Sequence, residues 1–392
     1  NSIFQCIAAT NFAAFPAVFA AVNGTNGGYV LPNATGQGQQ GDNWRVNTES
    51  LGLFTHNEFA ITDSLILTVG LRYSQETKDL NANLFATSTS CDALRLMETN
   101  TSAATPTPGG IVAAIQSSAG GSQLMNLACN PAVNPIANGS YADSSEEEEF
   151  SGTASLAYHL SDSTMLYGGY SRGYKAGGFN VDRSGFFITP ATTAVGSCAV
   201  ANPLGRVCTD DLQFNPEFTD AYELGLKTTI LGGTTTVNIA GFYQQIQDYQ
   251  LNAFNGFNYI TRNIPESISQ GVELEVSARP TDNLTLQGGV VYTDAFYDST
   301  VVFNALDPAP NTVVAGTPFA FTSEYTVTGA ITYEQPLGGN LRALFYIDGR
   351  WNNGYRTQTL NRDPSGRTDN DAFAIFNGRI GIGPEDGRWS VD

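Results

Sequence analysis

Positive charge is scarce in this sequence, and the scarcity excludes one broad class of partner. The 392 residues include 18 Lys and Arg against 37 Asp and Glu, for a formal net charge of -19. Nucleic-acid binding depends on Lys and Arg side chains clustered against the phosphate backbone. We therefore expect no nucleic acid among the partners of this protein.

Long apolar runs are also lacking. A membrane-spanning helix needs about 18 or more consecutive apolar residues, and the most apolar stretch, residues 12–22, is short and is interrupted by Pro16. That stretch has no basic flank, so it does not follow the pattern of a signal peptide. The sequence begins at Asn1 rather than at a methionine, and we expect it to be a piece of a longer protein.

Histidine is rare, and cysteine does not have the spacing of a metal site. His56 and His159 both fall inside alternating segments, which favours structural or lumen-facing roles over catalysis. None of the five cysteines forms the Cys-x-x-Cys pair typical of zinc and redox sites. With no recognisable pairing of a nucleophile and a base, the sequence predicts no enzyme, no cofactor and no metal ion.

The cysteines instead indicate disulfides in loops. Cys91 with Cys129, and Cys198 with Cys208, each bracket a polar segment rich in Gly, Pro, Ser and Thr. Two such bridges require an oxidising compartment. Cys6 is then left over, and we expect its partner to lie upstream. The alternative is that all five cysteines are reduced.

What the sequence does contain is a repeated turn followed by a long alternating segment. Asp63, Asp162 and Asp282 each begin a tight turn and are each followed seven residues later by a glycine. Further turns are predicted at residues 232–233, 338–340 and 385–387, because short Asp-, Asn- and Gly-rich turns suit a hairpin.

The segments between these turns alternate with period two, which is the period of a β-strand. Leu65, Leu67 and Val69 share one face in such a strand, whereas Thr68 and Gly70 lie on the other. The polar face carries charges in mid-strand. The charged positions include Glu223, Lys227, Glu273, Glu275, Arg342, Asp348 and Arg350.

Connections alternate between short and long. One end of the predicted sheet has only the tight turns, and the other has the segments 80–148, 181–213, 300–317 and 361–370. This asymmetry is typical of an outer-membrane barrel, which has short periplasmic turns and long extracellular loops. The expected strands are 44–60, 65–79, 149–160, 164–180, 214–231, 234–254, 258–280, 284–299, 318–337, 341–360 and 371–383, with another beginning near Arg388.

We therefore predict an all-β fold, an antiparallel transmembrane β-barrel of which this chain supplies a part. An open sheet of this size would expose two unpaired edges to lipid, so the whole barrel needs more strands. Residues 1–43 are expected to be an extracellular loop segment, and residues 44–392 the partial barrel.

Several strand motifs resemble those of the TonB-dependent outer-membrane receptors. The segment Tyr170-Ser171-Arg172-Gly173-Tyr174-Lys175-Ala176-Gly177-Gly178-Phe179-Asn180 is similar to a recurring segment of that family. The same holds for Phe214-Asn215-Pro216-Glu217 with Tyr222-Glu223-Leu224-Gly225-Leu226-Lys227, for Gly271-Val272-Glu273-Leu274-Glu275, and for Leu71-Arg72-Tyr73. The resemblance covers about residues 44–392.

The resemblance implies a barrel of about 22 strands with a plugged lumen, in the outer membrane of a Gram-negative bacterium. The implied function is import of a scarce extracellular small molecule, most often a ferric siderophore, driven by the TonB energy-coupling complex acting through the plug. The plug, the coupling box and the final strands are expected to lie outside this sequence. Outer-membrane lipid is the other implied partner. A passive porin, or an adhesin with disulfide-stapled loops, is the alternative.

Two sets of residues are candidates for binding. Arg172, Tyr174, Lys175 and Phe179 lie near the loop end and could hold a ligand ring or a carboxylate, although packing or an aromatic girdle explains the same residues. The glutamates at 146–149 could bind Ca²⁺ through carboxylate oxygens, but we favour a solvated charge run where the loop joins the strand.

Overall fold

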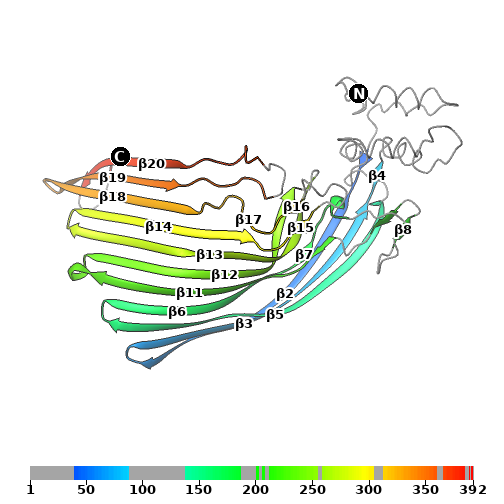
Figure 1. Cartoon of the computed structure of the whole chain (residues 1–392), viewed down its shortest axis with the longest axis horizontal. Coiled ribbons are helices and arrows are strands. Elements are labelled where there is room, and N and C mark those ends of the chain that lie inside the picture. The colour runs from blue at the N-terminus through cyan, green and yellow to red at the C-terminus, as the bar shows by residue number, and fades with distance from the viewer. Residues whose placement is uncertain are drawn as a thin grey trace, which may run out of the picture.

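The computed structural model describes residues 39–87, 137–186, 200–202, 205–207, 212–254, 258–303, 312–359, 365–384, 388, 390 and 391. Figure 1 shows one broad curved sheet, with tight hairpin turns at one end and longer connections at the other. The sheet is open, as expected for part of a barrel wall.

Eleven long strands run antiparallel through this described sheet, each hydrogen-bonded to the next one along the chain, and the short β17 pairs with β14. The order is β2 (Asn43–Thr62), β3 (Leu65–Leu84), β5 (Gly139–Ser161), β6 (Thr164–Lys175), β11 (Glu217–Ile230), β12 (Thr235–Phe254), β13 (Tyr259–Thr281), β14 (Leu284–Tyr297), β18 (Tyr325–Gly338), β19 (Leu341–Asn352) and β20 (Phe373–Pro384).

Short elements occur mainly at the loop end. They are β1 (Gln39–Gln40), β4 (Ala86–Thr87), β7 (Gly178–Phe179), β8 (Val200–Asn202), β9 (Gly205–Val207), β10 (Gln213–Phe214), β15 (Val301–Val302), β16 (Thr312–Val313), β17 (Thr317–Pro318) and the 3-10 turn η3 (Arg183–Gly185), while the 3-10 turn η5 (Leu231–Gly233) joins β11 to β12 at the opposite end. No helix in the described ranges is long and apolar enough to cross a membrane.

The predicted tight turns are confirmed wherever the structure describes them. Residues 63–64 and 162–163 connect neighbouring strands, and Gly338, Gly339 and Asn340 turn the chain with positive φ angles of 83°, 61° and 66°. Positive φ has little steric cost for glycine and is tolerated by asparagine, which explains the residue types here. The turn predicted at 385–387 lies outside the described residues.

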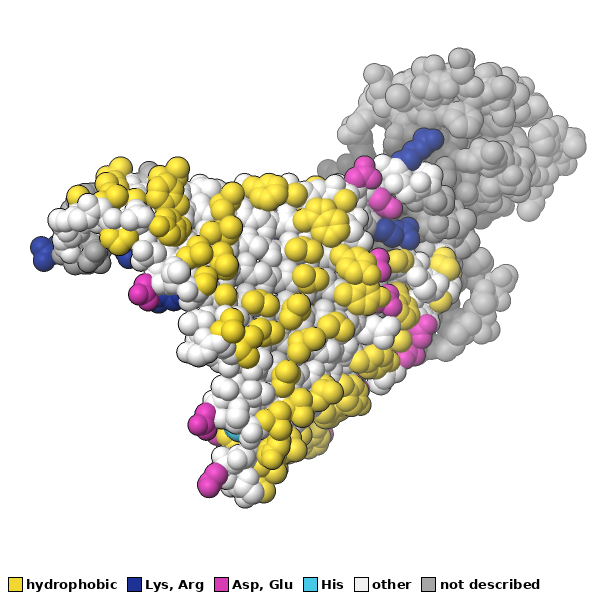
Figure 2. Space-filling model, turned by 60° about the vertical axis from the view of Figure 1, so that its left-hand side comes forward, with side chains coloured by type: hydrophobic (Ala, Val, Ile, Leu, Met, Phe, Trp, Pro, Cys, Tyr) yellow, Lys and Arg dark blue, Asp and Glu magenta, His cyan; other side chains and the backbone are white. Residues whose placement is uncertain are grey.

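Strand register places the alternating residues on two distinct faces. Leu67 pairs with Leu156, Leu224 with Gly168, and Ile331 with Ile347, so the apolar positions of neighbouring strands align. We call this apolar side the outer face and the opposite side the inner face. Many large side chains of the outer face are exposed, including Leu53 at 62% and Leu224 at 62%. Figure 2 shows hydrophobic side chains spread over the sheet, with Asp and Glu mainly toward its margins.

Aromatic side chains form two belts on the outer face. The belt nearer the loop end consists of Tyr73, Phe150, Tyr170, Tyr222, Tyr243, Tyr292, Tyr325 and Trp351, and several of its rings touch, with centroids 5.2 Å apart for Tyr170 and Tyr222. The belt nearer the turns consists of Tyr158, Tyr333 and Phe345. Eight residues separate the belts on β18, about 26 Å along a strand, which matches the apolar band of an outer-membrane barrel.

Some strands extend far beyond that band. β5 has 23 residues, whereas about 9–11 suffice to cross a bilayer. The strand predicted from residue 149 begins at Gly139 and includes all four glutamates. Outside the membrane both faces of a strand can meet water, so the charged run there does not interrupt the strand. Two other strands are shorter than predicted: β18 begins at Tyr325 rather than at residue 318, and β19 ends at Asn352 rather than at residue 360.

Glycine is required where an aromatic ring and a neighbouring strand occupy the space of a side chain. A Cβ atom at Gly271 would lie 2.0 Å from the carbonyl oxygen of Tyr292 and 2.8 Å from the Phe242 ring. A Cβ at Gly173, on the same inner face, would meet nothing closer than 3.9 Å.

Gly271→Ala should therefore lower the free energy of unfolding by about 1–3 kcal/mol, the usual cost of overpacking, whereas Gly173→Ala should leave it nearly unchanged. Urea unfolding of the whole protein in lipid vesicles, followed by tryptophan fluorescence, measures both variants. Equal effects of the two substitutions would contradict this explanation of Gly271.

Candidate functional site

The four candidate ligand residues lie close together along the chain, but their side chains do not converge. Arg172 lies on the outer face, where its Nη1 donates to Asp220 Oδ1 at 3.1 Å and to Oδ2 at 2.9 Å. Tyr170 donates to the same carboxylate at 2.6 Å, and the Phe218 ring centroid lies 4.8 Å from the guanidinium carbon. Arg172 thus joins β6 to β11 just beyond the aromatic belt.

Tyr174 is also engaged within the wall. Its hydroxyl donates to Glu147 Oε2, and the Gly177 amide donates to the same carboxylate at 3.1 and 3.2 Å. Lys78 donates to the Gly177 carbonyl at 2.7 Å. Both the backbone amide and the backbone carbonyl of Gly177 are therefore hydrogen-bonded to side chains. These contacts connect β6 to the extended parts of β3 and β5.

Lys175 and Phe179 differ sharply in accessibility. The Lys175 side chain is 60% exposed, and its Nζ lies 3.9 Å from a Glu217 carboxylate oxygen. Phe179 is 9% exposed and packs in a hydrophobic cluster. Of the four candidates, Lys175 is therefore the most available to a ligand in solution. The cluster contains Leu80, Ala82, Leu84, Ala137, Tyr141, Phe179, Phe186 and Leu212, with Trp44 against it.

The chain from 177 to 186, which we call the rim segment, connects distant parts of the wall. Asn180 makes two hydrogen bonds to Thr261 of β13, accepting from its amide at 2.7 Å and donating to its carbonyl at 2.9 Å. The backbone N–H of Asn180 also donates to the Leu212 carbonyl at 2.7 Å. A side-chain amide here takes the place of a paired strand, because it offers the same donor and acceptor as a peptide group.

Arg183 anchors the other end of the rim segment. Its side chain is fully buried, and its Nε and Nη2 donate to the two oxygens of Asp42 at 2.9 and 2.6 Å. Nη1 also reaches Asn138 Oδ1 at 3.4 Å, and that amide pairs with both backbone groups of Ala86. This bidentate geometry is the strong form of an Arg–carboxylate pair.

Two buried tyrosines, Tyr141 and Tyr297, and the partly buried Tyr249 stabilise the loop end of the wall. Burial raises the pKa of the Tyr141, Tyr249 and Tyr297 hydroxyls above the usual value for tyrosine. Tyr141 donates to the Ala137 carbonyl at 3.0 Å. The Tyr249, Tyr297 and Phe319 rings form a second cluster, with centroids 4.6 Å apart for Tyr297 and Phe319.

Nearer the turns, the inner face is polar and carries charges of both signs. Tyr167 donates to Glu223 at 2.5 Å, and Lys227 lies 5.2 Å from the Tyr167 ring centroid. Asn238 donates to Glu275 at 3.2 Å. Such a wall suits water, a polar solute or a polar protein surface, and it cannot face hydrocarbon without a large desolvation cost.

The structure offers little for catalysis or for metal binding within its described residues. Alternation along β5 places Glu147 and Glu149 on the face opposite Glu146 and Glu148. Among described residues, no group of three or more His, Cys, Asp and Glu side chains is placed to hold a metal ion. The proposed disulfide residues Cys91, Cys129, Cys198 and Cys208, and also Cys6, lie outside the described ranges, so those pairings stay predictions.

The sequence alone does not mark Asn180, Arg183 or Asp42 as structural anchors. Asn180 ends the recognised motif, but its partner Thr261 is 81 residues away. Arg183 and Asp42 are 141 residues apart. The one local signal was an isolated arginine following a Gly-Gly-Phe-Asn run, and that does not specify a partner.

Asp42→Ala should cost about 3–5 kcal/mol, because it removes the carboxylate that compensates a fully buried guanidinium. Hydrogen–deuterium exchange of the rim segment in the whole protein should rise strongly. The matched control is Glu334→Ala, whose partner Arg342 is 42% exposed and should cost less than about 1 kcal/mol. Unchanged exchange in Asp42→Ala would show that the ion pair does not hold the rim.

Two solved structures share this arrangement of strands. The ferric yersiniabactin uptake receptor FyuA from Yersinia pestis superposes with a TM-score of 0.55 at 14% identity, covering 88% of this chain and 39% of that one. The siderophore receptor PiuA from Acinetobacter baumannii gives a TM-score of 0.53 at 13% identity, covering 88% of this chain and 38% of that one. At these identities the likeness concerns the fold, and the chain spans less than half the length of either receptor.

The sequence itself matches the family described as TonB dependent receptor-like, beta-barrel, over residues 10–392. The match includes all the described strands, and the apolar outer face, the polar inner face and the unequal connections agree with it. The predicted fold class and location in the outer membrane of a Gram-negative bacterium are thereby confirmed. The chain belongs to the TonB-dependent receptor β-barrel family.

Proposed function

We propose that this chain is the wall of a transporter that captures a scarce small molecule outside the cell and imports it through the barrel. The main support is the combination of a charged inner face with a rim segment braced by the Asn180 and Arg183 contacts. A charged lumen provides a polar path across the membrane, and a braced rim provides a fixed base for extracellular binding loops.

The proposed substrate class is a ferric siderophore. PiuA is named as a siderophore receptor and FyuA as an uptake receptor for ferric yersiniabactin, and the family resemblance favours a ferric siderophore. The proposed energy source is the TonB complex, acting on a plug that belongs to the whole protein.

The first test is uptake by cells that produce the whole receptor, with and without the energy-coupling protein, using radiolabelled ferric siderophores and labelled cobalamin. We expect siderophore uptake that depends on coupling. Uptake that is independent of coupling would indicate a passive porin and contradict the proposal. Coupled uptake of cobalamin alone would overturn the substrate class while keeping active transport.

Lys175 is the candidate ligand residue to test first, because its side chain is the most exposed of the four. If its charge contacts an anionic group of the substrate, Lys175→Gln should raise Kd about fivefold, equal to about 1 kcal/mol for an exposed charge. Lys175→Arg keeps the charge and should bind nearly as the natural protein does. Isothermal titration of the purified whole receptor measures both, and identical Kd values would remove Lys175 from the site.

A further inference from the structure

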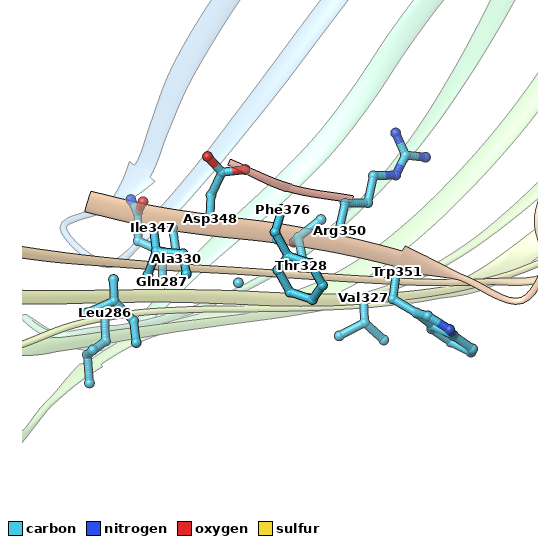
Figure 3. A pocket seen from close by; sticks show the side chains of 13 residues that line it. Leu286, Gln287, Val327, Thr328, Ala330, Ile347, Asp348, Arg350, Trp351 and Phe376 are labelled. Carbon is cyan, nitrogen blue, oxygen red and sulfur yellow. The ribbon is translucent and has the colours of Figure 1, made fainter. Parts of the chain in front are cut away.

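An apolar groove with a volume of about 450 Å³ crosses the outer face of β14, β18, β19 and β20. Figure 3 shows Leu286, Val327 and Trp351 pointing to one side of the sheet, with Asp348 and Arg350 pointing to the other. The groove therefore belongs to the side that faces lipid, and neither of these two charged side chains enters it.

Two glycines, Gly329 and Gly349, form the floor of this groove, and Gly288 lies beside them on β14. Strand register aligns Gly288 with Gly329, and Gly329 with Gly349, so three adjacent strands lack a side chain at the same level. The Phe376 ring extends over Gly349 from β20, since a Cβ there would lie 2.6 Å from the ring. The apolar walls are Leu286, Val327, Ile331, Ile347, Trp351 and Phe376.

The groove lies near the middle of the membrane. Gly329 is four residues from Tyr325 of one aromatic belt and four from Tyr333 of the other, about 13 Å along the strand in each direction. At this depth the surroundings are hydrocarbon. The walls are accessible, with Ile347 exposed by 50% and Phe376 by 71%.

We propose that this groove binds one acyl chain of an outer-membrane lipid and retains it longer than the lipid around the rest of the barrel. The groove is continuous with the lipid-facing surface. Its lining includes Gln287, Thr328, Asp348 and Arg350, but strand alternation assigns these four side chains to the inner face, so the side chains that wall the groove are apolar. A flexible chain can follow the glycine floor and gain contacts with walls on both sides. An unfilled groove would forfeit those dispersion contacts.

The test uses the whole receptor reconstituted in vesicles of phosphatidylcholine that carry a small fraction of lipid with a photoreactive diazirine near the acyl methyl end. After illumination, mass spectrometry measures labelling of peptides containing Ile331, Trp351 and Phe376 against a reference peptide containing Leu224, which is also on the outer face. We expect at least about fivefold more labelling in the groove.

Gly329→Leu should fill the groove and reduce its labelling to the reference level, and Gly329→Ala should reduce it partly. The Gly329 site accepts a Cβ, because the nearest atom would be 3.8 Å away. Gly241→Leu is the matched control, since it adds the same side chain to the same face, with the nearest atom 3.9 Å from the Cβ, and it lies outside the groove.

The outcomes separate the possible occupants. Groove labelling that is lost in Gly329→Leu and kept in Gly241→Leu supports a bound acyl chain. Uniform labelling of the outer face, unaffected by either variant, would overturn the proposal. Absence of groove labelling together with a dimer in native mass spectra would overturn it in favour of a second copy of the protein. Heat-modified migration on gels checks that each variant is folded, and Gly329→Ala keeps the test decisive if the leucine variant does not fold.

Discussion

Backbone polar groups cannot remain unpaired in hydrocarbon, and the rest of this structure depends on that constraint. The long strands between Asn43 and Pro384 satisfy it by hydrogen-bonding to their neighbours in the sheet, and in the described sheet β2 and β20 each have one edge without a neighbouring strand. Once the ladder is fixed, alternation assigns every side chain to the outer or inner face. The apolar outer surface and the charged inner wall are consequences of this pairing.

Beyond the aromatic belt nearer the loop end the constraint weakens, because water can satisfy the backbone polar groups. Pairing between β5 and β6 extends only as far as Gly152 with Arg172, while β5 continues to pair with β3 as far as Gly139 (Figure 1). The wall is therefore divided above the membrane. Side chains take over the connecting role, first Glu147 with Tyr174 and Gly177, then the contacts of Asn180 and Arg183.

The sequence was sufficient to predict what local patterns control. Strands such as β12 and β14 were placed within two residues, because their polar turns and alternating faces mark both ends. The start of β5 was missed by ten residues, because charged residues in a strand outside the membrane have the composition of a loop. Among the candidate ligand residues, the motif predicted proximity along the chain but not direction. Arg172 follows the strand alternation onto the outer face, where its partner Asp220 lies far away in sequence. Phe179 lies beyond that strand and packs into a core of residues that are also distant in sequence.

The division of the wall between β5 and β6 has a consequence for how such a protein can change over generations. Within the membrane, backbone hydrogen bonds between neighbouring strands fix the register. The shape of the rim instead depends on a few side-chain contacts between distant segments. Substitutions and insertions at the rim can therefore accumulate without shifting any strand against its neighbour in the bilayer. The surface outside the membrane can therefore diversify while the part of the wall that lies in lipid is inherited unchanged.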